Sequence, residues 1–236
     1  MFIKNNSQSI TSKIKSKLKQ IKSSINKKKN NFLSRLNKKK YVENLKKEYY
    51  DYTKEFSKNA NKTRKKLQNE YPIPNLDVIE EHFIVEWGMD SGPLNRYLRK
   101  IDKVSESQKK FFLSYIQRLN KVINKYNNIQ HNTLLHRRVS SDFFIEDVGK
   151  IGKFETPIST SFNDHAIKKK NYGDFHISIL APKDVNGAYL EEIMKKHHGI
   201  NHNHEEWLLP INTKYKTLYK NYETKEAVII LLTWSD

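Results

Sequence analysis

The spacing of apolar residues changes near residue 130, and this change limits the folds open to the chain. Before it, apolar residues recur every three or four positions, which predicts three helices. The first spans 75–88, the second begins at Pro93, and the third spans 105–126. After it, short apolar or alternating runs between turn residues predict strands at 133–139, 158–162, 175–180, 207–209, 214–219 and 227–233. Helices followed by strands indicate an α+β domain with a mostly antiparallel sheet.

Two of the predicted helices have apolar residues on one face. In the first, these residues are Ile79, Phe83 and Trp87. In the third, they are Phe111, Tyr115, Leu119 and Ile123.

Basic residues are concentrated in the first third of the chain. Residues 1–70 contain 21 Lys and Arg against 5 Asp and Glu, whereas residues 71–236 contain 23 against 21. This asymmetry predicts a basic helical extension over 1–74 and a near-neutral domain over 75–236. Pro72 and Pro74 mark the boundary, because each proline interrupts a helix and restricts the residue before it.

The spacing of apolar residues in the extension predicts two apolar helical faces. A narrow apolar stripe on a lysine-rich background consists of Ile10, Ile14, Leu18, Ile21 and Ile25. Two interpretations lead: the stripe packs on the next helix, or residues 1–40 lie on an anionic membrane surface. A third, an organelle-type presequence, fits less well because the basic residues are almost all Lys. Nucleic acid is not expected as a partner, because residues 3–31 lack aromatic side chains for base stacking. A second face consists of Tyr41, Leu45, Tyr49, Tyr52 and Phe56.

The chain lacks cysteine and lacks long apolar runs, and each absence excludes a class of protein. The chain has no cysteine, which excludes disulfides, thiolate metal sites and a cysteine nucleophile. No run approaches the ~20 apolar residues of a membrane span, and the N-terminus lacks the apolar run of a secretory signal. We therefore expect a soluble protein.

Three segments carry residues suited to cleaving NAD. Arg137 and Arg138 end a predicted strand, where two adjacent guanidiniums can form forked hydrogen bonds to a diphosphate. Ser159 and Ser161 lie at alternate positions of the next strand, so both hydroxyls point to one side and can orient a carboxylate. Glu206 precedes an apolar strand that ends at Pro210. A carboxylate bonded to the ribose 2′-hydroxyl stabilises the positive charge that develops as nicotinamide leaves.

Each segment alone has an ordinary structural explanation, but their order resembles the signature of mono-ADP-ribosyltransferases of the bacterial toxin type. Residues 93–99 resemble the helical Asn-x-x-Leu-Arg segment of that family, and the two arginines look like those of actin-modifying binary-toxin enzymes. Residues 186–190 and 212–216 are similar to the flanks of the last motif. The resemblance spans about residues 75–236.

This resemblance implies two small, roughly perpendicular sheets around a cleft that binds NAD as a substrate. It implies that Glu206 is the catalytic glutamate and that Ser159 positions it. Arg137, assisted by Arg138, would bind the phosphates, and Asn95 with Arg99 would contact the adenosine or phosphate part. Residues 162–172 would fold over NAD.

Two further expectations concern this cleft. Phe162 is a candidate wall for the nicotinamide ring. No metal is expected, although His197, His198, His202 and His204 form a ligand-rich tract, because the tract falls in the acceptor-recognition loop that the resemblance implies.

His204 departs from the family pattern, which has Glu or Gln two residues before the catalytic Glu. A neutral imidazole can accept a proton from an incoming nucleophile, but it cannot hold a guanidinium by two hydrogen bonds. An arginine acceptor is therefore less secure than ADP-ribosyl transfer to a protein such as actin or a small GTPase.

Two alternatives to transfer stay open: an NAD glycohydrolase, and a catalytically silent basic protein that binds membranes. For the enzyme, we expect secretion or delivery by a bacterium, or a phage-encoded protein that acts in the cytoplasm.

Overall fold

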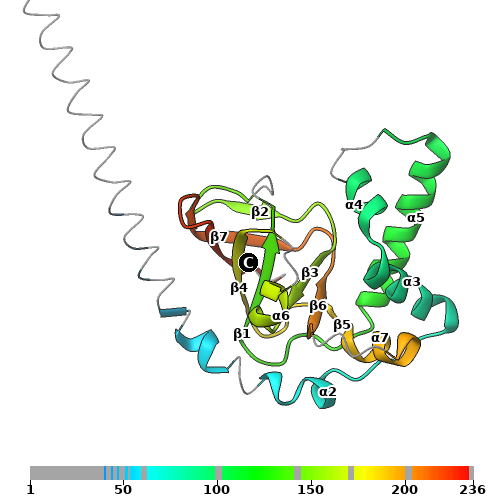
Figure 1. Ribbon diagram of the computed structural model, residues 1–236, viewed down its shortest axis with the longest axis horizontal. Coiled ribbons are helices and arrows are strands. Elements are labelled where there is room, and N and C mark those ends of the chain that lie inside the picture. Colours follow the sequence, from blue (N-terminus) through cyan, green and yellow to red (C-terminus); the bar gives the residue numbers. More distant parts are fainter. Residues whose placement is uncertain are drawn as a thin grey trace, which may run out of the picture. The chain divides into compact units, whose positions relative to one another are not determined.

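The protein is described here by a computed structural model (Figure 1). The residues described are 40, 44, 47, 51–52, 54–59, 63–98, 103–140, 145–169, 173–199 and 204–233. The chain divides into two compact units, Met1–Leu45 and Lys46–Asp236. The apolar stripe from Ile10 to Ile25 lies outside the described residues, as do Tyr41, Leu45 and Tyr49. The helices and strands from residue 67 onward belong to the second unit.

Helices come first in this unit: α2 (Leu67–Glu70), α3 (Val78–Met89), α4 (Gly92–Leu98) and α5 (Glu106–Ile123). Helix α5 begins as predicted, because Ser105 and Gln108 form a capping box. Helix α3 begins later than predicted. Its cap is Asp77, since the Asp77 carboxylate accepts hydrogen bonds from the amides of Ile79 and Glu80.

The apolar faces of α3 and α5 are buried only in part, because Ile79 and Phe111 are exposed. Their exposed fractions are 61% and 64%, whereas Trp87 and Leu119 are buried. A neighbouring element covers only a limited length of each helix, so periodicity alone does not fix how far burial extends. The covered positions of α3 and α5 form one core with residues of β5 (Ala188–Tyr189), β6 (Glu206–Leu209) and α7 (Glu191–His198).

The remaining strands are β1 (Thr133–Val139), β2 (Ile151–Lys153), β3 (Ile158–Ser161), β4 (Phe175–Ala181), β7 (Lys214–Asn221) and β8 (Glu226–Leu231). All eight pair in the order β2-β7-β8-β4-β1-β3-β6-β5, and each pair is antiparallel except β4 with β8. The predicted α+β class with a mostly antiparallel sheet is confirmed. The six predicted strands are present, whereas β2 and β5 are too short to show a period.

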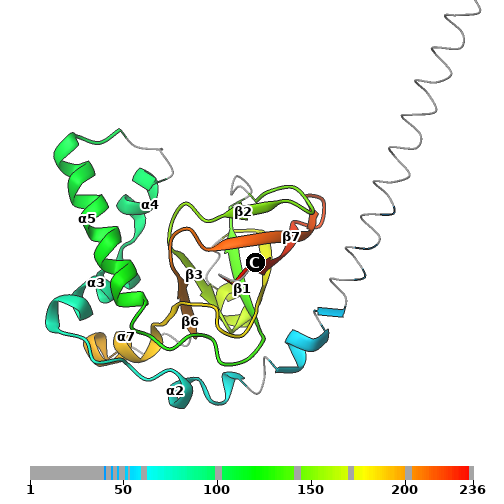
Figure 2. The same cartoon turned by 180° about the vertical axis from the view of Figure 1, so that it is seen from behind.

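The resemblance implied two sheets, and the structure joins the corresponding strands into one hydrogen-bonded order (Figures 1 and 2). The two parts, β2-β7-β8-β4-β1 and β3-β6-β5, meet through the register pair of His136 and Ser161. Between β3 and β4, helix α6 (Asp164–Lys169) occupies most of the segment expected to fold over NAD.

Residues upstream of Pro74 contribute to the cores of this unit. Leu67 and Tyr71 belong to the largest apolar cluster, and the Tyr71 ring meets that of Trp207 edge-on at a centroid distance of 5.0 Å. Phe56 packs in a smaller cluster with Leu180 and Leu218. The basic extension drawn from charge alone therefore includes residues that support the sheet.

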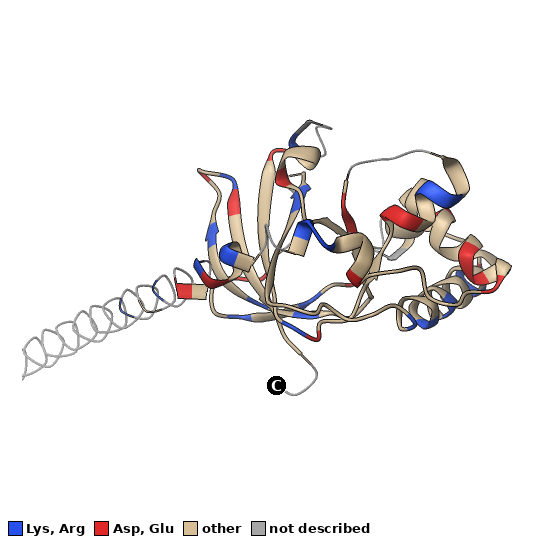
Figure 3. Cartoon of the chain, turned by 90° about the horizontal axis from the view of Figure 1, so that it is seen from below, with Lys and Arg blue, Asp and Glu red and all other residues tan. Residues whose placement is uncertain are grey.

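Charged residues of both signs are interspersed along the helices and strands (Figure 3). This distribution agrees with the near-neutral balance of residues 71–236. Within the described part of the chain, no helix has the length and apolar character needed to cross a membrane.

Replacing Tyr71 with Ala should lower the free energy of unfolding by about 3–5 kcal/mol, because it removes a ring that is 1% exposed. Tyr71→Phe should cost about 1 kcal/mol, since the hydroxyl accepts the Gln130 amide at 3.0 Å. Urea unfolding measures both. Tyr222→Ala is the matched control, because that ring is 66% exposed. Wild-type stability of Tyr71→Ala would show that this segment is not part of the core.

Candidate functional site

A cavity of about 430 Å³ lies where the helical part meets the sheet. Trp87 of α3, strands β1, β3 and β6, and Met194 of α7 contribute to its wall. Six of the predicted site residues line it together: Asn95, Arg137, Arg138, Ser159, His204 and Glu206. Positions more than a hundred residues apart in the sequence thus share one cavity.

The pairing of β3 with β6 sets the wall of this cavity that carries Glu206. Ser161 pairs with Glu206, and Ser159 pairs with Leu208. Since side chains alternate along a strand, Ser159, Ser161 and Glu206 share one face. The residue directly opposite Glu206 is Ser161, and Ser159 is one step further along that face. The Trp87 indole donates to the Ser159 hydroxyl at 3.4 Å.

Ser161 also fixes the chain where it enters β6. Its side chain is 2% exposed, and its hydroxyl donates to the carbonyl of His204 while accepting the amide of Asn163 at 2.8 Å. The Phe162 amide donates to the carbonyl of Glu205 at 3.1 Å. The end of β3 thereby holds the two residues that precede Glu206.

Phe162 lies in the core and not in the cavity wall, which corrects its expected role beside nicotinamide. It is 3% exposed, and its ring centroid is 5.9 Å from that of Trp207 and 6.4 Å from that of Tyr71. Strand alternation gives the reason, because residue 162 follows Thr160 on the face opposite Ser159 and Ser161.

The two arginines occupy different positions around the cavity. The Arg137 guanidinium donates to the carbonyl of Ser159, which links β1 to β3. Arg138 Nη2 lies 3.9 Å from a carboxylate oxygen of Asp164. Arg138 Nε is buried and has no hydrogen-bond partner among the described residues. A phosphate oxygen would satisfy such a donor.

Asn95 and Arg99 are the two predicted site residues of the Asn-x-x-Leu-Arg segment. Asn95, on α4, lines the cavity, and its Oδ1 is buried without a hydrogen-bond partner in the described ranges. Arg99 follows α4 and lies outside the described residues.

Two glutamates that the sequence did not single out hold the segment before Glu206. Glu191, the first residue of α7, is 6% exposed and accepts the amides of His204 at 3.2 Å and Glu205 at 3.1 Å. Glu205 binds Arg64 by two hydrogen bonds of 2.6 and 2.8 Å. No local pattern could have revealed these pairs, because 141 residues separate Arg64 from Glu205.

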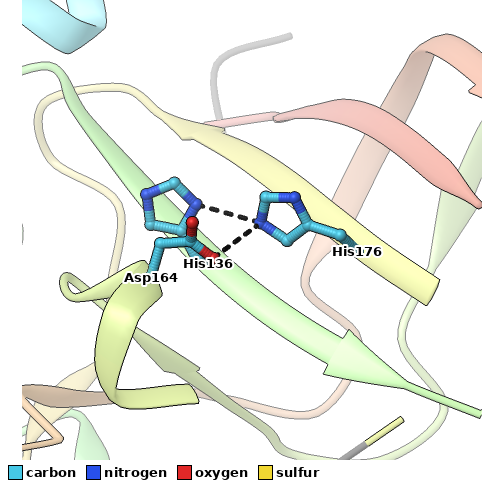
Figure 4. A group of neighbouring side chains, drawn as sticks. All are labelled: His136, Asp164 and His176. Carbon is cyan, nitrogen blue, oxygen red and sulfur yellow. Dashed lines mark hydrogen bonds and ion pairs between the residues drawn. The ribbon is translucent and has the colours of Figure 1, made fainter. Parts of the chain in front are cut away.

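One group among the described residues could hold a metal ion: His136, Asp164 and His176 (Figure 4). His136 Nδ1 lies 3.2 Å from His176 Nε2, which lies 3.4 Å from a carboxylate oxygen of Asp164. Asp164 is also paired with Lys168 and lies near Arg138. These cations oppose the binding of another cation and favour an anion. The predicted histidine tract forms no such group within the described residues.

Burial, followed by the neighbouring His176, lowers the pKa of His136 to about 4. Burial also lowers the pKa of His176. Burial opposes the shift of Asp164, but the Lys168 hydrogen bond and the histidine charges lower the pKa of that carboxyl. Near neutral pH the cluster is therefore a carboxylate beside two neutral imidazoles.

Between pH 7 and pH 5, His136 should make the free energy of unfolding fall by about 2 kcal/mol. The pKa of the folded chain lies below the ordinary ~6.5, so the unfolded chain takes up the proton first as pH falls. His136→Asn should flatten this slope in urea unfolding measured at a series of pH values. An unchanged slope in His136→Asn would contradict the assignment.

Comparison with known proteins gives matches through structure alone. No family model matches the chain, and no curated protein sequence matches it. The C3 exoenzyme of Clostridium limosum matches with a TM-score of 0.55 and 16% identity, over 74% of this chain and 95% of that protein. Plx2a, an ADP-ribosyltransferase toxin from Paenibacillus larvae, matches with a TM-score of 0.52 and 17% identity, over 80% and 97%.

C3stau2 from S. aureus, in a structure with NAD, matches with a TM-score of 0.50 and 16% identity, over 77% of this chain and 93% of that protein. At these identities the similarity concerns the fold. The chain therefore has the fold of bacterial ADP-ribosyltransferase toxins, as the resemblance of its motifs predicted.

Proposed function

We propose that this protein is a mono-ADP-ribosyltransferase that cleaves NAD and transfers ADP-ribose to a side chain of another protein. The observation that carries the proposal is the placement of Glu206, which lies opposite Ser161 on one wall of a cavity that Arg137 and Arg138 also line. The fold supports the proposal, as does the C3stau2 structure with NAD.

The polar groups of the cavity suit the parts of NAD. The buried Arg138 Nε offers a donor to the diphosphate, and Arg137 lies beside it in the chain. The buried Asn95 Oδ1 offers an acceptor to a hydroxyl or an amino group of the adenosine part. His136, in its neutral form, adds no charge of its own.

Glu206 would act on the nicotinamide ribose. The bond from ribose C1′ to the nicotinamide nitrogen breaks, its electron pair leaves with nicotinamide, and the ribose gains oxocarbenium character. The Glu206 carboxylate accepts a hydrogen bond from the 2′-hydroxyl and stabilises this charge. A lone pair of the acceptor then forms the new bond to C1′. His204, which lines the cavity, is the candidate that receives the proton of the acceptor.

The geometry disfavours an acceptor that is held by a carboxylate. Glu205 binds Arg64 and does not line the cavity, and Glu191 accepts two backbone amides. His204 takes the place at which a carboxylate would hold an arginine. We therefore infer a protein acceptor other than an arginine side chain. The class of acceptor that we propose is a protein of the target cell, such as actin or a small GTPase.

Replacing Glu206 with Gln should lower the rate of NAD cleavage by about 10²–10³-fold, because it removes the charge that stabilises the transition state. Release of nicotinamide and transfer of radiolabel from NAD to a lysate measure the two steps. Glu226→Gln, at the exposed start of β8, is the matched control and should retain full activity. Transfer by Glu206→Gln at the wild-type rate would refute the role of Glu206.

The same assay separates transfer from hydrolysis. A transferase should release nicotinamide faster when lysate supplies an acceptor, and the label should appear on protein. Equal release with and without lysate, and no labelled protein, would identify an NAD glycohydrolase. Absence of any NAD cleavage would favour the silent membrane-binding alternative.

A further inference from the structure

We propose that Arg64, from the segment upstream of the catalytic motifs, is a positioning residue that sets the start of β6 by holding Glu205. Its catalytic consequence rests on the proposed function of Glu206. Its structural consequence, a fixed conformation of residues 204–206, does not.

The contact is a two-point pair of opposite charges. Arg64 Nε lies 2.6 Å from one carboxylate oxygen of Glu205, and a terminal nitrogen lies 2.8 Å from the other. The side chains are 35% and 21% exposed, so water screens the pair only in part. Hydrogen bonding to Glu205 raises the pKa of Arg64. A forked guanidinium fixes both the position and the rotation of a carboxylate, which a lysine ammonium does not.

The backbone next to Glu206 needs such a restraint. Glu205 has φ of 48°, in the left-handed region that non-glycine residues rarely adopt. Holding a residue there costs free energy, so the surrounding contacts must maintain the conformation. They come from Glu191, which accepts the amides of residues 204 and 205, and from Ser161 and Phe162, which donate to their carbonyls. Arg64 alone among these holds the side chain of Glu205.

The backbone segment that carries Arg64 is itself held by buried residues. Thr63 is 1% exposed and its carbonyl accepts the amide of Lys66 at 2.9 Å. Leu67 and Tyr71, which follow, lie in the cluster that contains Trp207. This cluster covers the face of β6 opposite the face that Glu206 shares with Ser161. Arg64 thus connects the packed side of β6 to the residue that precedes the catalytic one.

Arg64→Met should lower kcat for NAD cleavage about tenfold or more, because small misplacements of a catalytic group are costly. The KM for NAD should stay within about threefold of wild type, since neither Arg64 nor Glu205 lines the cavity. Arg64→Lys should lie between, because it keeps the charge and loses the fork. Lys65→Met, which removes an exposed neighbouring cation, is the matched control and should match wild type.

Charge reversal tests the pairing directly. Arg64→Glu and Glu205→Arg should each lower kcat, and the double variant should recover part of the loss, because it restores opposite charges at the same two positions. A merely destabilising substitution would show no such recovery. Equal kcat in Arg64→Met and wild type would overturn the catalytic part of the proposal.

Hydrogen exchange gives a readout that does not depend on catalysis. In Arg64→Met, the amides of residues 204–206 should exchange about fivefold faster or more, while those of β1 and β4 should not change. Wild-type protection in that variant would overturn the positioning role. If wild type cleaves no NAD, the proposed function fails, and the exchange of residues 204–206 alone decides the role of Arg64.

Discussion

The site depends on the antiparallel pairing of β3 with β6, because this pairing gives β6 two faces with different surroundings. On one face, Trp207 and Leu209 lie in the largest apolar cluster. On the other, Glu206 lies beside Ser161 and faces the cavity. Burial of the first face holds the strand rigidly, so the carboxylate on the second face has a defined position in a short strand of four residues.

Polar contacts also fix the conformation of the two residues just before β6. His204 and Glu205 are bonded through their backbone to α7 and to the end of β3, and Glu205 is bonded through its side chain to Arg64. Each contact joins parts of the chain that are distant in sequence. Packing and hydrogen bonding therefore place residues 63–71 within the structure that supports the strand carrying Glu206, although composition alone assigns them to a basic extension.

Much of the fold could be read from periodicity, since long amphipathic helices and alternating strands carry strong local signals. Strands β2 and β5 and helices α6 and α7 were missed, because two to eight residues give few periods to detect. The burial of Phe162 could have been read from alternation, which places it opposite Ser159 and Ser161. The exposure of Ile79 and Phe111 could not, since it depends on how far the neighbouring elements extend.

By itself, the sequence determined the α+β class and the order in which arginines, serines and a glutamate occur along the chain, because both are properties of local pattern and spacing. Only the tertiary structure decided which of these groups meet. It placed Ser161 opposite Glu206, joined Asp164 to His176 and Arg138, and brought Arg64 to Glu205. Strand register and packing set these distances, and both arise from contacts between segments that no local pattern encodes.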